Sequence, residues 1–237
     1  MDTSQIKPVP IQELLKLVLI FLKSSFDKTL EGFYTISGID GSGQNTQCTR
    51  LAYYFSKRGQ DGWEDCWVTG QPREIGKGAE IRAILRHQVS EDPGEFAVQM
   101  MMAEDRAEHM GEIMGELWNN RRVVCARYLD DNAIYSRARG LDETEIADVL
   151  AANSEFPRPK VAIYLDLPVE EAMRRIRKRS EETGKPLERF ETPECLMLVK
   201  EGFLALAKVL PNVHVVDATG TEDEVHQRIV AVIEQFG

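Results

Sequence analysis

Residues 38–46 form a glycine-rich stretch whose spacing could hold phosphate. They read Gly-Ile-Asp-Gly-Ser-Gly-Gln-Asn-Thr, with Gly38 and Gly43 at the separation found in the phosphate loop G-x-x-x-x-G-K-[ST]. Glycines permit positive φ angles and let backbone amides converge on an anion, and the N-terminus of a following helix adds its positive dipole end. We therefore predict phosphate contacts from this loop. The residues expected to make them are Gly38, Gly41, Ser42, Gly43, Gln44, Asn45 and Thr46.

Two side chains of this loop depart from the pattern. Gln44 stands where the pattern has lysine, and Asn45 stands where it has serine or threonine. The lysine reaches the β/γ oxygens and the hydroxyl binds Mg²⁺; losing one preorganised group of this kind costs about 3–4 kcal/mol of transition-state stabilisation. Thr46 comes one residue late, about 100° around a helix. The loop predicts nucleotide binding, whereas the two substitutions argue against efficient phosphoryl transfer. The alternative without a ligand is that the loop only connects a strand to a helix.

The elements that must position this loop alternate between short apolar runs and helical stretches. Strands are predicted over residues 33–36, 66–69, 123–125, 161–167 and 213–216. Helices are predicted over 45–58, 76–88, 95–119, 142–152, 168–182, 192–209 and 222–236. This βαβ order is typical of a parallel sheet with helices on both faces. We predict a three-layer α/β/α fold of the P-loop NTPase type with a five-stranded parallel sheet, whose ligands bind at the carboxyl ends of the strands.

Residues 1–30 stand apart from this alternation. Pro10 can begin a helix over about residues 11–30, where apolar side chains recur at helical spacing. These side chains are Ile11, Leu14, Leu15, Val18, Leu22 and Phe26. Such a helix needs to bury its apolar face against the main domain or a second subunit, and membrane association is the less favoured alternative. We therefore separate an N-terminal helical extension, 1–30, from a main domain, 31–237.

The composition argues against several classes of protein. A formal net charge of −10 opposes general binding to nucleic acid or to anionic membrane surfaces. The four cysteines and four histidines lack metal-binding spacing, so we expect reduced thiols and no metal site built from side chains. No segment reaches the roughly 20 apolar residues of a membrane span, and the apolar run 17–22 lacks the flanks of a secretory signal. We expect a cytoplasmic protein.

Five sequence blocks follow one another from residue 33 onward. After the phosphate loop come Ala-Glu-Asp-Arg-Ala-Glu-His at 103–109, Ala-Arg-Tyr at 126–128, Val-Ala-Ile-Tyr-Leu-Asp-Leu-Pro at 161–168 and Arg-Phe-Glu at 189–191. Together they resemble the thymidylate kinase family of P-loop nucleoside monophosphate kinases, over about 200 residues. The resemblance implies that residues 31–237 form a kinase-like domain with a mobile lid around 177–190.

The resemblance also implies roles for four residues outside the glycines. Asp40 would accept a hydrogen bond from the 3′-hydroxyl of the substrate, Arg106 would contact the base, and Tyr128 would pack against the sugar. Arg127 would bind phosphate bidentately, as a guanidinium does well.

Lid arginines are a further expectation from the family. In members that lack an arginine after the loop aspartate, where this chain has Gly41, arginines of the lid supply transition-state charge. Arg177 and Arg179 of the lid, together with Arg127, are the residues we expect to act in catalysis. The two lid arginines belong to a basic cluster of Arg174, Arg175, Arg177, Lys178, Arg179 and Lys185, whose plain alternative is a solvated helix face.

Further departures from the family pattern fall where chemistry would occur. Ala126 replaces an aspartate, and Gly70 replaces an arginine that reaches the acceptor phosphate. Asp131 and Ser136 replace residues that line the thymine pocket. Because phosphoryl transfer depends on such charges, these losses weigh against efficient catalysis.

Two main hypotheses follow. The first is a kinase that transfers the γ-phosphoryl of ATP, with Mg²⁺, to dTMP or a similar deoxynucleotide. The second is a catalytically impaired nucleotide-binding or scaffold protein, and a third option is a kinase with another acceptor or donor. In each case we expect small-molecule nucleotides as ligands and a homodimer, with neither nucleic acid nor membrane as a partner.

Overall fold

The computed structural model describes residues 7–21, 28–58 and 65–236. Within these residues five parallel strands form one sheet in the order β2-β3-β1-β4-β5. The strands are β1 (Thr29–Gly38), β2 (Asp65–Gly70), β3 (Arg121–Ala126), β4 (Arg158–Asp166) and β5 (Val213–Asp217). β1 is therefore central, and the loop that follows it leaves the sheet at the middle of its carboxyl edge.

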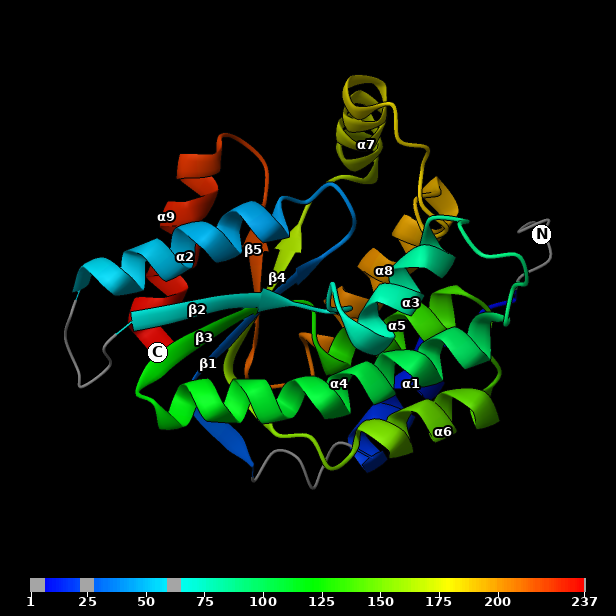
Figure 1. The fold of residues 1–237 in the computed structure, drawn as a ribbon, viewed down its shortest axis with the longest axis horizontal. Coiled ribbons are helices and arrows are strands. Elements are labelled where there is room, and N and C mark those ends of the chain that lie inside the picture. The colour runs from blue at the N-terminus through cyan, green and yellow to red at the C-terminus, as the bar shows by residue number, and fades with distance from the viewer. Residues whose placement is uncertain (1–6, 22–27, 59–64, 237) are drawn as a thin grey trace.

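Helices cover both faces of this sheet (Figure 1). They are α1 (Ile11–Phe21), α2 (Gln44–Arg58), α3 (Gly76–Leu85), α4 (Glu95–Trp118), α5 (Leu129–Ala138), α6 (Glu143–Asn153), α7 (Val169–Thr183), α8 (Pro193–Leu206) and α9 (Glu222–Phe236). α2 and α9 lie on one side of the sheet, and α4 lies on the other. The predicted three-layer fold with a five-stranded parallel sheet is confirmed.

The sequence pattern located the strands because the sheet is buried on both faces. In β1, every residue from Phe33 to Gly38 is buried, so the strand reads as a continuous run without polar alternation. Parallel pairing joins Phe33 to Val123 of β3 and Ile36 to Ile163 of β4. This pairing fixes the end of β1 beside the ends of β3 and β4.

The helix α5 was not predicted. Its residues are buried almost all round, and they include the polar side chains of Asp131, Asn132, Ser136 and Arg137. A helix of this kind has no apolar stripe, so the spacing of its apolar residues does not identify it as a helix. Polar residues are buried there because they form hydrogen bonds with one another and with neighbouring elements.

The N-terminal helix is shorter than predicted. Its described part, α1, spans Ile11–Phe21, and β1 begins at Thr29, so the helix cannot reach residue 30 and the boundary that we placed there falls within the first strand. Leu14 and Val18 are fully buried and belong to the same core as the sheet, which confirms the expectation that the helix packs on the main domain. Leu22 and Phe26, which we also assigned to it, lie outside the described residues. Arg137 Nε donates to the Val9 carbonyl (2.8 Å) and ties the helix's entry to α5.

Candidate functional site

The predicted phosphate loop connects β1 to α2. Gly41 and Gly43 have φ angles of +82° and +90°, which favour glycine. A Cβ atom on Gly41 would stand 2.8 Å from the Ala172 carbonyl of α7, whereas one on Gly43 would meet nothing within 4 Å. The loop therefore needs glycine at 41 for both conformation and space, and it brings the backbone to the N-terminus of a 15-residue helix.

The side chains of this loop are incompletely paired. Ser42 Oγ and Gln44 Oε1 are buried and have no hydrogen-bond partner among the described residues. Gln44 and Asn45 line the cleft described below, while Thr46 is exposed on α2. Buried polar atoms without partners are rare in native proteins and mark a place where a ligand can supply the missing bond. The Ser42 hydroxyl and the backbone N–H groups of the loop can donate to an anion, whereas Gln44 Oε1 would accept from a donor on a ligand.

Arg127 lies at the junction of the loop and β3. Its Nη2 donates to Asp40 Oδ1 (2.7 Å), and its Nη1 donates to Asp131 Oδ1 (3.0 Å) and to the hydroxyl of Tyr135 (3.0 Å). Burial opposes the charge, but Tyr135, Asp40 and Asp131 outweigh it and hold the pKa of Arg127 well above its ordinary value. The residue has φ +65° although it is not glycine. Such strain costs about 1–3 kcal/mol and concentrates at functional sites.

Arg106 is buried in α4, with 2 % of its surface exposed. Its hydrogen-bond acceptors are the amide oxygens of Gln71, Asn132 and Asn153 and the carbonyl of Tyr128. Every one of these partners is neutral, and burial lowers the pKa of the guanidinium from its ordinary value. The side chain borders the cleft, so it is available to a ligand there.

Tyr128 borders the cleft but directs its hydroxyl into the protein. The hydroxyl donates to the Pro157 carbonyl (3.0 Å) and contacts Met110 Sδ, while the ring packs edge-on against Phe33. Asp131, expected near a base, lines the cleft but is held by Ser37 Oγ (2.6 Å), Arg127 and the Tyr128 N–H (3.0 Å). Burial raises the pKa of Asp131, and these partners oppose that shift.

Ser136 does not belong with the residues that line the cleft. It is fully buried in α5, and its hydroxyl donates to the carbonyl of Asn132 (2.7 Å). The expectation that Ser136 borders a base pocket is therefore wrong. The amides of Gln71, Gln99 and Asn132 border the cleft instead, and we did not predict them from the sequence.

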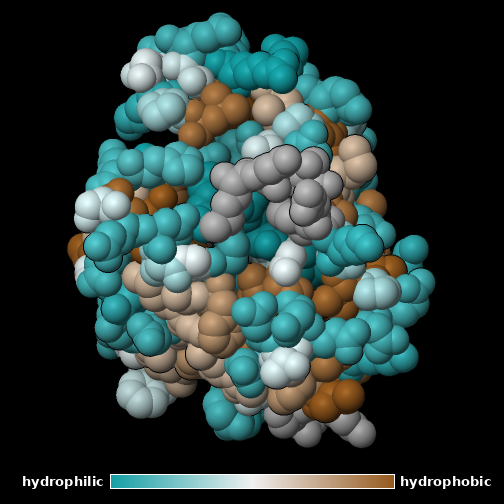
Figure 2. All heavy atoms as spheres, turned by 90° about the vertical axis from the view of Figure 1, so that its right-hand side faces the viewer, coloured by the Kyte–Doolittle hydropathy of each residue, from teal (hydrophilic) through white to brown (hydrophobic). Residues whose placement is uncertain are grey.

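The arginines of the predicted lid and Lys178 lie on α7, which projects from the top of the molecule in Figure 1, whereas Lys185 follows the end of this helix. Figure 2 shows mainly hydrophilic side chains at this end. Arg179 reaches the cleft and pairs with Glu191 (2.6 Å), whereas Arg177 is exposed on α7 and is not among the lining residues. Arg174 and Arg175 both bind Glu171 and lower the pKa of that carboxyl to about 2.

One cleft of about 360 Å³ joins these parts. It is bordered by five arginines (Arg82, Arg86, Arg106, Arg127 and Arg179) and five carboxylates (Asp40, Glu74, Asp131, Glu188 and Glu191). Four of the arginines pair with these carboxylates, as in Arg82–Glu74 (3.2 Å) and Arg86–Glu188 (3.3 Å). A phosphate entering the cleft must therefore compete with carboxylates for guanidinium groups, a feature that the sequence did not indicate.

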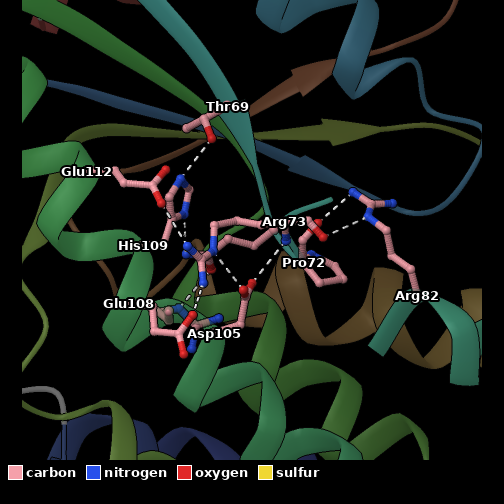
Figure 3. Close-up of polar contacts among 10 residues, drawn as sticks. Thr69, Pro72, Arg73, Arg82, Asp105, Glu108, His109 and Glu112 are labelled. Atoms are coloured by element: carbon pink, nitrogen blue, oxygen red, sulfur yellow. Dashed lines mark hydrogen bonds and ion pairs between the residues drawn. The ribbon is translucent and has the colours of Figure 1, made fainter. Parts of the chain in front are cut away.

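A second polar cluster, also missed from the sequence, fixes the loop after β2 to α4 (Figure 3). Arg73 binds Asp105 through both its backbone N–H (3.0 Å) and its Nε (2.8 Å), and it also pairs with Glu108 and Glu112. Beside it, His109 is fully buried between Thr69 and Gln71. This cluster holds Gln71 and Pro72 against the cleft.

The sheet order, the central glycine loop and the cleft at the strands' carboxyl edge define a P-loop NTPase-type nucleotide-handling protein. A sequence model of the thymidylate kinase family matches residues 36–229. The chain is 34% identical to a probable thymidylate kinase of Pyrococcus horikoshii over 206 residues, covering 85% of this chain and 95% of that protein. It is 33% identical to a thymidylate kinase of Desulfosudis oleivorans over 211 residues, covering 86% and 96%. The chain therefore belongs to the thymidylate kinase family.

A solved structure supports the same fold. The thymidylate kinase of Candida albicans superposes with a TM-score of 0.68 at 22% sequence identity, over 86% of this chain and 91% of that one. At this identity the match bears on the fold alone.

Among the described residues, no helix is both long and apolar enough to span a membrane. No group of three histidine, cysteine or acidic side chains among residues 7–21, 28–58 and 65–236 is placed to hold a metal ion.

Proposed function

We propose that this chain is a nucleoside monophosphate kinase that transfers the γ-phosphoryl of ATP to dTMP or a similar deoxynucleotide. The observation that carries the proposal is the single cleft that the phosphate loop shares with Arg106 and Arg127. The loop end would hold the donor phosphates, Arg127 would bind phosphate, and Arg106 would contact the acceptor base. Asp40 would accept a hydrogen bond from the sugar, and the ring of Tyr128 would pack beside it.

The residues present fit the phosphates of ATP better than they fit a metal. The backbone N–H groups of the glycine loop and the unpaired Ser42 hydroxyl can donate to phosphate oxygens, whereas Gln44 Oε1 can only accept. Mg²⁺ needs few protein ligands, because it keeps several waters and binds mainly to substrate phosphates. Asp40 is the carboxylate that the loop offers, and bound Mg²⁺ would neutralise charge developing on the transferred group. Transition-state charge would come from Arg179, with Arg177 reaching the site only when α7 moves.

A competing function is nucleotide binding without efficient transfer. The observation that favours it is the joint presence of Gln44, Asn45, Ala126 and Gly70 at positions bordering the cleft. None of these side chains carries a charge. We further propose a cytoplasmic homodimer with small-molecule nucleotides as ligands and without nucleic acid or membrane partners.

A coupled assay with a panel of nucleoside monophosphates and ATP·Mg²⁺ tests the kinase proposal. Turnover with dTMP above the background of an Arg127→Gln variant supports it. No turnover with any acceptor refutes it, and calorimetry with dTMP and ATP then separates a binding protein from one that binds no nucleotide.

A further inference from the structure

Arg106 is oriented by hydrogen bonds to neutral oxygens and by its position over the Tyr128 ring, 5.5 Å from the ring centre. Its Nε–H donates to Gln71 Oε1 (2.9 Å), and its Nη groups donate to neutral oxygens of Asn132, Asn153 and Tyr128. A carboxylate would attract a guanidinium in many orientations, whereas amide oxygens hold it only where the bonds are well aligned. Four of its five N–H groups are used in this way, so the groups that fix these amides decide where the remaining Nη2–H of Arg106 points.

The direction of each bond along one side of Arg106 can be assigned. Arginine can only donate, so the Gln71 atom facing it is the amide oxygen, and the amide nitrogen faces His109 Nδ1 (3.0 Å). Nδ1 must then accept and carries no proton. The proton of neutral His109 lies on Nε2, which donates to Thr69 Oγ1 (2.8 Å), the contact drawn in Figure 3. A single tautomer satisfies Thr69, His109, Gln71 and Arg106 together.

A proton on Nδ1 would break this chain of bonds. Gln71 would have to turn its oxygen to His109, which would place its NH₂ group against the Arg106 Nε–H, two donors facing each other. Neutral His109 and an anchored Arg106 therefore require one another.

The surroundings of His109 keep it neutral. Burial lowers its pKa to about 4, and the charges of Arg73 and Arg106 act in the same direction, while Glu112 and Asp105 oppose them. The Trp67 ring packs edge-on at 5.8 Å and covers another side.

The loop that carries Gln71 is also held independently of His109. Arg73 binds Asp105, Glu108 and Glu112, and Arg106 and His109 lie on the same helix as those acids. The Gln71 N–H donates to the Ala126 carbonyl at the end of β3 (2.9 Å). The backbone of residue 71 is thus fixed from two sides, and His109 controls only which way its amide points.

We propose that His109 is a positioning residue for acceptor recognition, which acts through Gln71 to hold Arg106 in the orientation that faces the cleft. The inference rests on the proposed function, in which Arg106 contacts the acceptor base. His109 itself is not among the residues that line the cleft, so its influence on a ligand must pass through these two side chains.

Three variants separate this role from a general packing role. His109→Leu fills the space but leaves the Gln71 amide nitrogen without an acceptor. His109→Asn places its Oδ1 near the position of Nδ1 and can still accept from Gln71. Thr69→Val keeps the shape of Thr69 and removes only its bond to His109.

Calorimetry with dTMP and with ATP gives the first readout. Loss of a buried hydrogen bond predicts that His109→Leu weakens dTMP binding by about 10-fold or more, with ATP binding changed less than about twofold. His109→Asn and Thr69→Val should stay within about threefold of the wild type for both ligands. Unchanged dTMP binding in His109→Leu, or an equal loss for both nucleotides, would overturn the positioning role. If the wild type binds no nucleotide, the proposed function fails instead.

Nitrogen NMR of the imidazole rings gives a second readout that needs no nucleotide, and the chain has only four histidines to assign. We expect the neutral Nε2–H tautomer of His109 at pH 7. Gln71→Glu should raise the pKa of His109, because a carboxylate oxygen then faces Nδ1 and favours its protonation. An Nδ1–H tautomer in the wild type, or an unchanged titration in Gln71→Glu, would contradict the assigned chain of bonds whatever the kinase assay shows.

Discussion

The two ends of the cleft are held together in opposite ways. At the phosphate loop the main chain defines the site, while the Ser42 Oγ and Gln44 Oε1 atoms lack partners among the described residues. Around Arg106, by contrast, side chains define the site, and Gln71, Asn132 and Asn153 each supply an oxygen to the guanidinium. Under the proposed function, the Arg106 end would be a preorganised site for the acceptor base, whereas the loop end, which would hold the donor, lacks the lysine and the hydroxyl of the usual phosphate loop.

The largest expected effect comes from Arg127, which links the two ends. Arg127→Gln leaves Asp40 and Asp131 without their shared cation, so we expect the free energy of unfolding to fall by about 3–5 kcal/mol. Urea denaturation measures this change. Arg174→Gln, which removes an exposed pair with Glu171, is the control and should leave the free energy of unfolding nearly unchanged. Equal effects in the two variants would mean that Arg127 does not connect the loop with α5.

Restoring the missing groups of the loop tests the donor side. Gln44→Lys combined with Asn45→Thr should raise kcat about 100-fold or more, because such groups contribute about 3–4 kcal/mol to the transition state. Steady-state assays with ATP and dTMP measure the change, and Thr46→Val on the exposed side of α2 serves as the control. An unchanged kcat would show that other losses, such as Ala126 and Gly70, limit the rate.

Through His109, the stability of the protein should depend on pH. Its pKa is lowered from 6.5 to about 4 in the folded protein, so the unfolded chain binds the proton more tightly between these values. Its contribution to stability is complete above pH 6.5 and is lost as the pH falls towards 4, by up to about 3 kcal/mol. Urea denaturation of the wild type and His109→Asn across this range should show a shallower slope in the variant. Parallel curves would mean that His109 titrates normally.

Alanine substitutions at two glycines of the loop should have smaller effects, and they separate the cost of backbone strain from the cost of a steric clash. Gly41 and Gly43 both have positive φ angles, but only at Gly41 would a Cβ atom collide with a neighbour, the Ala172 carbonyl. Gly43→Ala should therefore cost about 1 kcal/mol of stability, and Gly41→Ala about 2 kcal/mol, because it adds the clash to the strain. Thermal unfolding ranks the two variants. A larger loss at Gly43 would place the close contact with α7 elsewhere.

The loop end of the cleft could be predicted from the sequence better than the end around Arg106. β1 and its loop were predictable because a buried apolar run ends in glycines at a fixed spacing. α5 was not, because its buried side chains include Asn132 and Arg137, whose partners come from distant parts of the chain. The importance of Gln71 and His109 was hidden for the same reason, since it arises from hydrogen bonds between β2, the following loop and α4. Local patterns identify backbone-defined sites, and they miss sites built from long-range polar contacts.

A calorimetric titration with dTMP, on the wild type and on the Gln44→Lys/Asn45→Thr variant, tests the contrast between the two ends of the cleft most directly. We predict saturable binding with the same Kd in both proteins, because the hydrogen bonds that hold Arg106 do not involve residues 44 and 45. Absence of dTMP binding in the wild type, or binding that appears only after the loop is restored, would contradict this account.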